Sequence, residues 1–447
     1  MKIISLFSGC GGLDLGFEKA GFEIIWANEF DKTIHETYRY NHPQTELNTR
    51  DIREINESDI PDSDGIIGGP PCQSWSLGGK CLGINDERGK LVFDYIRIVK
   101  DKKPKFFIME NVPGMVTPRH IQSFEQFLHL FREAGYQVKY ELLNAADYRI
   151  PQDRLRVFIV GIRADLKNEY FFPTKVSETP ITLSQAIGDL KEQPTAYLNE
   201  KVNQNYKGVL NHDYYNGGYD SKFMARNRIR GWQELSFTIQ AQAKNEPLHP
   251  QAPKMEYVSQ NERRFAMGHE KEYRRLSVRE CARVQTFPDH FRFIYSNIKD
   301  GYKMVGNAVP PRLAYYLALS VKDCLASNVA DKKKYMLVGY VKSEYDLSII
   351  KKHHVYYIRG GNRPGAMQYG QIQQVDLLVL HHGGNKYMFK LDKNCVVPCT
   401  SKDLMIFGFH PHGNEYWRIE IQEEIPIDQN IIGRISSFTK YPQIIGF

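Results

Sequence analysis

The sequence predicts an α/β fold built on a mostly parallel sheet, followed by a separate strand-rich region. Short apolar runs alternate with helix-length segments from residue 2 to about residue 161, as in parallel sheets. A glycine-rich turn follows the first apolar run, and an acidic residue follows the second. Beyond residue 335, short apolar runs lie between Gly, Asn and Pro turns, which indicates strands.

The amino-terminal elements have the layout of a nucleoside-binding βαβ unit. The expected strand, turn, helix and second strand occupy residues 2–7, 8–12, 13–20 and 22–27. The second strand ends on Asn28 and Glu29, an acid about twenty residues after the glycine-rich turn. Asp14 stands where the dinucleotide fingerprint has its third glycine, which favours an adenosyl ligand without a pyrophosphate over a nicotinamide cofactor. Asp51 follows a third short strand and is placed to accept a hydrogen bond from an adenine amino group.

Two later strand ends carry groups that are able to react. The apolar run 65–67 leads through two glycines and two prolines into Cys72. The prolines stiffen this exit and favour a nucleophilic thiol, with a small buried hydrophobe as the alternative. The strand 106–109 ends on Glu110, which taken alone is equally a solvated loop carboxylate. Because ligands bind outside the carboxyl ends of parallel strands, Cys72 and Glu110 are expected to face one crevice.

The stretch 171–270 loses the regular alternation and is rich in Asn, Gln, Tyr and Pro. Arg226, Arg228 and Arg230 place their guanidinium groups on one face if this segment is extended. Arginine reads guanine bidentately in the major groove, so these residues are candidate base readers, Arg228 first, with a basic surface edge as the alternative. Lys244 lies nearby and is a candidate DNA contact.

Regular structure resumes at residue 273. Ser277 is expected to cap a helix that runs through Gln285, with Glu280 completing a capping box. A further helix is expected over 313–325, and residues 326–334 have the composition of a linker.

The carboxyl-terminal part of the sequence, from residue 332 onward, contains residues typical of zinc binding and of nucleic-acid contact. Six histidines, with Cys395 and Cys399, suggest zinc, but their spacing misses the usual finger patterns, so no metal is expected. Lys332–Lys334 and the run 356–365 combine aromatic and cationic groups around glycines, a mixture that suits a nucleic-acid backbone. We expect an auxiliary DNA-contacting module, with a stabilising appendage as the alternative.

Composition narrows the class of protein. The 447 residues are 42% hydrophobic and 25% charged, which is ordinary for a globular chain. Seven cysteines, an odd number, favour free thiols in a reducing compartment. No signal peptide or membrane span is recognisable, and the net charge of +7 is compatible with a nucleic-acid partner. These properties favour a cytoplasmic protein that needs no membrane.

Six short blocks carry a family resemblance. They are FSGCGG at 7–12, PPCQ at 70–73, ENV at 110–112, QDRLR at 152–156, RECARVQ at 279–285 and GNAVP at 306–310. With these blocks in order and a variable segment between the fourth and fifth, residues 1 to about 326 resemble the C5-cytosine DNA methyltransferase family. The sequence around residues 73–76 and around the arginines at 226–230 is most similar to the bacterial restriction-modification members that recognise GGCC. Cys10 is a mild departure, since the family usually has a small residue or alanine there, and residues 335–447 lie outside the resemblance.

The resemblance implies a Rossmann-like sheet of class I S-adenosylmethionine-dependent methyltransferases with a small target-recognition domain. The implied domains are catalytic at 1–170, target-recognising at 171–270, catalytic again at 271–326, and accessory and strand-rich at 335–447. S-adenosylmethionine is the implied cofactor. Its implied contacts are Phe7, Gly9, Gly11, Gly12, Leu13, Asn28, Glu29, Asp51, Ile52, Pro70, Asn307 and Val309.

The resemblance also implies the catalytic roles. Cys72 would add to C6 of a flipped-out cytosine in double-stranded DNA, because C5 is too weak a nucleophile to take a methyl group unaided. Glu110 would contact N3 and the exocyclic amine, Arg156 would hold O2, and Arg154 would support it. Ser76 lies in the stretch 74–90, which is similar to the loop that closes over DNA. A monomer is expected, without a protein partner.

Two other functions fit parts of the sequence. A nicotinamide-dependent dehydrogenase fits the βαβ opening but leaves Cys72, Glu110 and the arginine run unexplained. An inactive DNA-binding protein fits the net positive charge but does not explain the Pro-Pro-Cys-Gln sequence after the strand.

Overall fold

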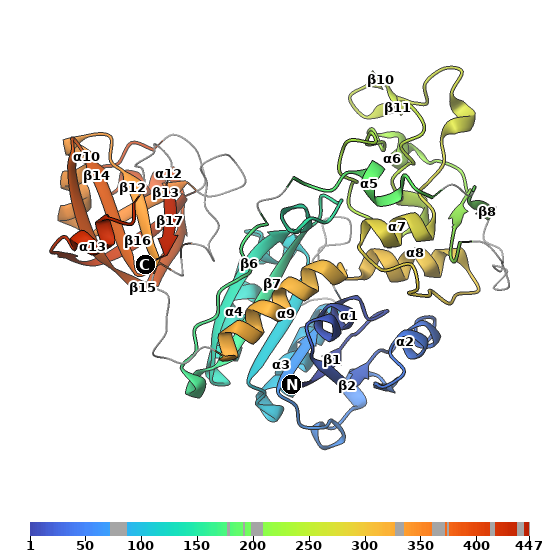
Figure 1. Ribbon diagram of the computed structural model, residues 1–447, viewed down its shortest axis with the longest axis horizontal. Helices are drawn as coiled ribbons and strands as arrows, with labels where there is room; N and C mark the ends of the chain where they lie inside the picture. Colours follow the sequence, from blue (N-terminus) through green and yellow to red (C-terminus); the bar gives the residue numbers. More distant parts are fainter. Residues whose placement is uncertain are drawn as a thin grey trace. The chain divides into compact units, whose positions relative to one another are not determined.

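The computed structural model describes residues 1–71, 87–176, 179–190, 193–197, 209–326, 335–359, 372, 375–411, 416–435 and 442–446 (Figure 1). The chain divides into two compact units. The first comprises Met1–Val138, Leu142–Lys167 and Pro173–Asp323, and the second comprises Lys139–Glu141, Asn168–Phe172 and Cys324–Phe447.

A seven-stranded sheet forms the centre of the first unit, with the order β3-β2-β1-β4-β5-β7-β6. The strands are β1 (Lys2–Leu6), β2 (Glu23–Asn28), β3 (Glu46–Asn48), β4 (Gly65–Gly68), β5 (Phe106–Asn111), β6 (Tyr136–Asn144) and β7 (Leu155–Arg163). The pairs β1–β2, β1–β4, β2–β3 and β4–β5 are parallel, whereas β5–β7 is antiparallel. The predicted mostly parallel α/β sheet is therefore confirmed.

Apolar packing explains why the central strands form. Every residue of β4 and β5 is buried, as expected where helices cover both faces of a parallel sheet. The principal helices of this part are α1 (Gly12–Lys19), α2 (His35–Asn41), α3 (Glu87–Lys102), α4 (Ile121–Glu133) and α9 (Pro311–Ala326). Phe107 of β5 stacks on Phe131 of α4 with ring centroids 4.1 Å apart. Gly161 of β7 makes room for this stack, since a Cβ there would lie 2.0 Å from the Phe107 ring.

The later part of the first unit consists of short elements, in agreement with the irregular sequence pattern. These are α5 (Leu183–Ile187), β8 (Thr195–Tyr197), β9 (Asp213–Tyr215), α6 (Ser221–Met224), β10 (Glu256–Ser259), β11 (Glu262–Arg264), α7 (Val278–Val284) and α8 (Ile298–Asn307). Strands β8 and β9 form one two-stranded sheet, and β10 and β11 form another. The predicted capping box is present at the start of α7, between Ser277 and Glu280.

The second unit contains a six-stranded sheet with the order β13-β16-β15-β14-β12-β17. Its elements are β12 (Tyr335–Tyr340), α10 (Glu344–His353), β13 (Val355–Arg359), β14 (Leu377–His382), β15 (Asn385–Cys399), α12 (Ser401–Met405), β16 (Tyr416–Ile425), α13 (Gln429–Ile432) and β17 (Gln443–Gly446). The β12–β14 pair is parallel, and the other pairs of this sheet are antiparallel. The predicted strand-rich region is thus confirmed.

Both faces of this second sheet are covered. Leu337 and Leu378 pack with residues of α10 and α12 on one face, while Met336 and Val379 pack with Ile432 of α13 on the other. Within the described ranges, no group of three His, Cys, Asp or Glu side chains is arranged to hold a metal ion. No helix in those ranges has the length and apolar character needed to cross a membrane.

Candidate functional site

The strand ends of the first sheet converge on one edge. Strands β1, β2, β4 and β5 are parallel and end at Leu6, Asn28, Gly68 and Asn111. The sheet order changes direction between β1 and β4, and ligands of open α/β sheets bind outside the carboxyl ends at such a point. The residues that the sequence predicts at these strand ends therefore share one edge of the sheet.

The turn after β1 is shaped to receive a ligand. Phe7, Gly9 and Gly11 have φ of 53°, 57° and 87°, which places all three in the left-handed region. The Gly9 amide donates to Oε2 of Glu29 over 2.9 Å. A Cβ built on Gly9 meets no atom within 4 Å, so this face of the turn is open. An adenosyl group fits such a turn with a carboxylate beside it.

Glu29 is well placed beneath that turn. Its Oε1 accepts from the amide of Asp31 over 2.8 Å, while Oε2 accepts from Gly9. Burial raises the pKa of Glu29, and the two amide hydrogen bonds oppose the rise. The bonds hold the carboxyl group against the turn, where the sequence analysis expects a cofactor contact.

A buried polar cluster supports the turn from the other side. Gly11 lies against His42, since a Cβ on this glycine would be 2.1 Å from Nε2 of the ring. Nδ1 of His42 and Oε1 of Glu18 are 2.9 Å apart, and the Tyr38 hydroxyl donates to Asp14 over 2.5 Å. Burial disfavours charge on His42, but Glu18 and Asp14 raise its pKa overall. Sequence reasoning missed His42, because no local pattern links it to a turn thirty residues earlier.

Other expected cofactor residues organise the neighbouring loops. The Asn28 side chain donates to the carbonyls of Asn48 and Arg50, over 3.2 and 2.9 Å, and so fixes the chain after β3. Asp51 accepts from the backbone amide and Nε of Arg53 and begins the 3-10 turn at Ile52, which is buried. Asp51 is therefore already paired with a guanidinium, which lowers its pKa.

The Asn307 block lies against α1. A Cβ on Gly12 would be 2.5 Å from the Val309 carbonyl oxygen, so the two backbones are in direct contact. Asn307 is the last residue of α8 and is exposed, whereas Leu13 is buried. The structure thus brings together residues from blocks almost 300 positions apart.

Glu110 and Arg156 form the charged centre of the site. Nε of Arg156 lies 3.0 Å from Oε1 of Glu110, and both side chains are largely buried. The antiparallel β5–β7 register explains the encounter, because Glu110 faces Phe158 near the start of β7. Burial raises the pKa of Glu110, and Arg156 and then Arg154 oppose the rise. The carboxyl group is thus both buried and paired with a cation at the end of β5.

The exit of β4 is fixed against this pair. A Cβ on Gly69 would be 3.2 Å from Oε2 of Glu110, and the Asn111 side chain donates to the Pro70 carbonyl over 3.2 Å. The chain therefore leaves the sheet beside the Glu110 carboxyl group. Cys72 and Ser76, which follow along the chain, lie outside the described residues.

Arg154 has a different environment from Arg156. It is 1% exposed, and its guanidinium donates to the carbonyls of Ile239, Gly306 and Ala308 over 3.2, 2.9 and 3.0 Å. Arg154 thus connects the start of β7 to the end of α8.

The arginine run is not arranged as the sequence predicted. Arg226 is exposed and Arg230 partly exposed, but Arg228 is 9% exposed. Arg228 donates from Nε to the Phe223 carbonyl over 3.0 Å and from Nη2 to the Lys222 carbonyl over 3.2 Å. The expectation of three guanidinium groups on one face is wrong for Arg228, because the helical turn at 221–224 draws it inward. Lys244 is exposed and lies 3.7 Å from Asp220.

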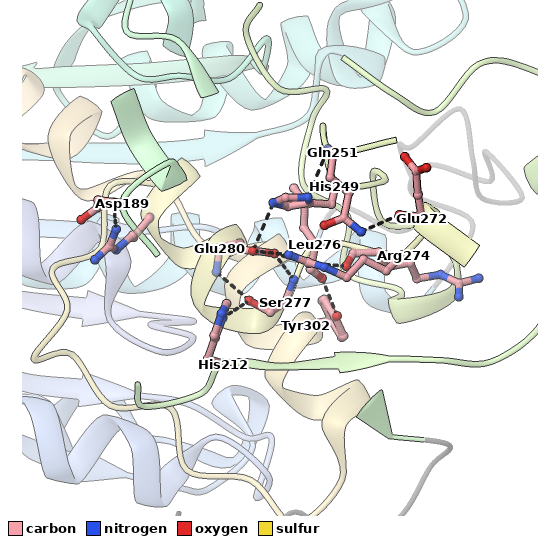
Figure 2. Close-up of polar contacts among 12 residues, drawn as sticks. Asp189, His212, His249, Gln251, Glu272, Arg274, Leu276, Ser277, Glu280 and Tyr302 are labelled. Atoms are coloured by element: carbon pink, nitrogen blue, oxygen red, sulfur yellow. Dashed lines mark hydrogen bonds and ion pairs between the residues drawn. The ribbon is translucent and has the colours of Figure 1, made fainter. Parts of the chain in front are cut away.

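A buried polar network around Glu280 was also not predicted beyond its capping box (Figure 2). Arg274 donates to both carboxylate oxygens of Glu280 over 2.7 Å each, and Ser277 accepts from the Glu280 amide. Nε2 of His249 lies 3.5 Å from Glu280. Burial opposes charge on Glu280, but Arg274 lowers its pKa to about 2, while burial lowers the pKa of His249 to about 4. Buried polar contacts therefore hold Glu280, within the block that begins at residue 279, in place.

Comparison with known proteins identifies the family of this chain. The family model for C-5 cytosine-specific DNA methylases matches residues 1–323. The Type II methyltransferase M.NgoPII of Neisseria gonorrhoeae is 53% identical over 331 residues, which are 73% of this chain and 96% of the relative. M.FnuDI of Fusobacterium nucleatum, also a Type II methyltransferase, is 53% identical over 337 residues, 75% of this chain and 98% of the relative.

A solved structure shares the fold. A prophage-encoded DNA modification methyltransferase of E. coli is 23% identical, with a TM-score of 0.55, and the match covers 73% of this chain and 100% of that one. The family match ends before the linker, so residues 335–447 lie beyond it.

Proposed function

The chain belongs to the C-5 cytosine-specific DNA methylase family, and on this premise we propose how its residues perform the reaction. It is a cytosine-5 DNA methyltransferase of the Type II restriction-modification kind. We propose that it takes the methyl group from S-adenosylmethionine and modifies a flipped-out cytosine in double-stranded DNA. The Glu110–Arg156 pair at the exit of β5, beside the chain that leads to Cys72, carries this proposal.

Cys72 is the proposed nucleophile. Its thiolate adds to C6 of the cytosine, a new C6–S bond forms, and the ring electrons shift so that C5 becomes nucleophilic. After C5 is methylated, loss of the C5 proton restores the ring and the C6–S bond breaks. A resting thiol has a pKa of about 8.5, so positive potential near Cys72 would increase the thiolate fraction.

Glu110 and Arg156 are proposed to neutralise the charge that develops on the ring. Glu110 would contact N3 and the exocyclic amine as sulfur adds; burial raises the pKa of its carboxyl group, and Arg156 and Arg154 oppose the rise. Arg156 would bind O2 of the same base, and its position 3.0 Å from Glu110 supports this role. A charge held in a buried, preorganised site stabilises a transition state more than one in water does.

The edge of the sheet at β1 and β2 is the proposed cofactor site. S-adenosylmethionine supplies an electrophilic methyl group on a sulfonium. The open face at Gly9 and the Glu29 carboxyl group beside it fit the adenosyl part, with Glu29 toward the ribose. Gly11, Gly12, Leu13, Phe7, Asn28, Asp51, Ile52, Pro70, Asn307 and Val309 remain the further proposed contacts. Asp51 would have to share its carboxylate with Arg53 to reach the adenine amine.

The recognition sequence is proposed to be GGCC, from the similarity around residues 73–76 and the arginine run. Exposure makes Arg226 and Arg230 the better base readers, with Arg228 as their support. Arg226→Ala should cost about 1–3 kcal/mol of discrimination at one guanine. Bisulfite sequencing of DNA modified in vitro identifies the methylated site and measures that relaxation. An equal loss on all sequences would assign Arg226 to phosphate.

Two further properties are proposed. The enzyme acts as a monomer in the bacterial cytoplasm, because a single chain supplies the paired residues of the described site and the cysteines suit a reducing compartment. Sedimentation at enzyme concentrations used for assay would test the first point.

The decisive experiment combines a substitution with a mechanism-based trap. Cys72→Ser should abolish transfer of tritiated methyl groups to DNA while specific DNA binding is retained. Duplex DNA with 5-fluorocytosine at the target should form a covalent complex that survives denaturation, because fluorine blocks the last proton loss. No such complex should form with Cys72→Ser.

Cys399→Ser is the matched control. Cys399 lies in the second unit, and burial raises the pKa of its thiol to about 11, so it stays protonated. This variant should methylate and form the trapped complex like the parent. If Cys72→Ser retains a tenth of the parent rate, the covalent mechanism is wrong.

A further inference from the structure

A polar cavity is lined by residues other than those of the cofactor turn and the Glu110–Arg156 pair. Its volume is about 510 Å³, and its lining includes Arg149, Thr179, Thr182, Ser184, Gln185 and Gln233. One guanidinium, hydroxyl groups and amide groups thus surround one space. Arginine, Ser, Thr and Gln side chains are the groups that contact phosphate oxygens of nucleic acids.

Arg149 has an unusual backbone conformation at this cavity. Its φ of 57° and ψ of 37° are left-handed, a region that favours glycine and asparagine. The surrounding chain enforces the conformation, because Arg312 of α9 donates to the Arg149 carbonyl and Tyr148 donates to the Pro173 carbonyl over 2.8 Å. A strained non-glycine residue that neighbouring contacts hold in place points to a role for its side chain.

The chain path places the cavity at the catalytic edge. β7 is antiparallel to β5, and Asn111 at the end of β5 pairs with Val157 near the start of β7. Arg149 precedes β7 by six residues and so lies toward the edge that carries Glu110. Ser236 donates to the Pro151 carbonyl over 2.9 Å, which brings the segment of Gln233 and Arg230 alongside.

The local charges favour an anion. Arg312 approaches Arg149, and the burial of Arg312 together with this neighbour lowers the Arg312 pKa. The nearest acid along the chain, Asp147, is 2.8 Å from Nζ of Lys175. Glu234 accepts from the Gly231 amide and lies 3.1 Å from Lys254. These two carboxylates are thus already compensated by cations or amides.

We propose that this cavity binds one phosphodiester group of the DNA substrate, with Arg149 as its principal cation. The inference rests on the proposed action on double-stranded DNA and adds a backbone contact beside the base-flipping site. A duplex that presents a base to Glu110 passes its backbone along the same edge of the sheet. Arg149 then fixes the position of the strand without reading its sequence.

The test uses the full-length chain and the salt dependence of DNA binding. Arg149→Gly removes the guanidinium and accepts the left-handed conformation without strain. Its affinity for a GGCC duplex should fall about 5–10-fold at 0.15 M salt, and the slope of log K against log salt should become smaller by about 1. Arg149→Lys, which keeps the charge, should keep the slope. The affinity of Arg149→Gly for S-adenosylmethionine should equal that of the parent.

Lys167→Gly provides a matched control. Lys167 is also cationic and left-handed, with φ of 56°, but it follows the opposite end of β7 and does not line the cavity. This variant should keep the parent slope. An unchanged slope in Arg149→Gly, or an equal decrease in both glycine variants, would overturn the phosphate site. If instead the parent transfers no methyl group to any duplex, the proposed function itself fails.

Discussion

The two large sheets of this chain distribute their polar groups differently. In the first sheet the parallel strands β1, β2, β4 and β5 end at one edge. At this edge Gly9 contacts Glu29, and Gly69 lies beside the Glu110 carboxyl group. In the second sheet, antiparallel pairing sends consecutive strand ends to opposite edges. Its charges pair locally instead, as between Lys351 and Glu424 at 3.0 Å and between Arg418 and Glu420 at 3.1 Å. Parallel topology concentrates reactive groups, and antiparallel topology disperses them.

The largest expected effect is on kcat, and it should distinguish a carboxyl group of the first sheet from one of the second. Glu110→Gln removes the ionisable proton from the buried pair with Arg156 and should lower kcat about 10²–10⁴-fold. Glu423→Gln in β16 removes an exposed carboxylate that lies 3.8 Å from Lys390 and should leave kcat unchanged. Single-turnover methyl transfer measures both. Equal losses in the two variants would remove the functional distinction between the sheets.

The same contrast explains what the sequence could predict. The exits at Gly9, Glu29 and Glu110 were predictable, because glycine turns and acids directly after apolar runs are local patterns. His42 beneath Gly11 and the inward turn of Arg228 were not, since both depend on packing between segments that no local pattern connects. The strand content of the second unit was predictable from its apolar runs, but the order of its strands was not. Antiparallel pairing across long loops leaves no spacing rule in the sequence.

Two glycine-to-alanine substitutions, one in each unit, compare the effect of backbone strain alone with that of strain plus a steric clash. Gly11 and Gly384 have φ of 87° and 84°, so alanine is strained at either position by about 1–2 kcal/mol. Only Gly11 also faces an obstruction, the His42 ring at 2.1 Å, whereas a Cβ on Gly384 meets nothing within 4 Å. Gly11→Ala should therefore lose more stability than Gly384→Ala and should weaken S-adenosylmethionine binding. Thermal melts and calorimetric titration measure the two effects, and equal losses would contradict the role of His42.

The acid response should come from the first unit. The pKa of His249 is lowered to about 4, against about 6.5 for an unfolded histidine. Between about pH 6.5 and pH 4, His249 is therefore protonated in the unfolded chain but not in the folded chain. The free energy of unfolding decreases as pH falls through this range. At roughly 1.4 kcal/mol per pKa unit, the loss approaches about 3 kcal/mol. Burial is the main cause of the lowered pKa of His249, and the charge of Arg274 lowers it further, whereas Glu280 opposes both.

His249→Gln should flatten the stability profile over this pH range, because glutamine does not titrate. Glu280 and Arg274, with His212, are the charged or titratable neighbours of His249, and the pKa of Glu280 near 2 keeps it ionised throughout. His353→Gln, an exposed position in the second unit, serves as the control and should keep the parent profile. Urea unfolding at several pH values measures the difference. A steep loss that persists in His249→Gln would assign the acid response to another group.

The smallest expected effect concerns removal of the second sheet. Truncation after Ala330 should leave the methylated sequence unchanged, since M.NgoPII and M.FnuDI match this chain over 96% and 98% of their own lengths within about three quarters of it. DNA binding should weaken only a few-fold, with a smaller salt slope, because residues 335–447 carry 12 Lys and Arg against 10 Asp and Glu. Several of those cations are already paired, as Lys351 is with Glu424 and Lys390 with Glu423. Unaltered affinity and slope, with a lower melting temperature, would instead favour the stabilising appendage and would confine DNA contact to the first unit.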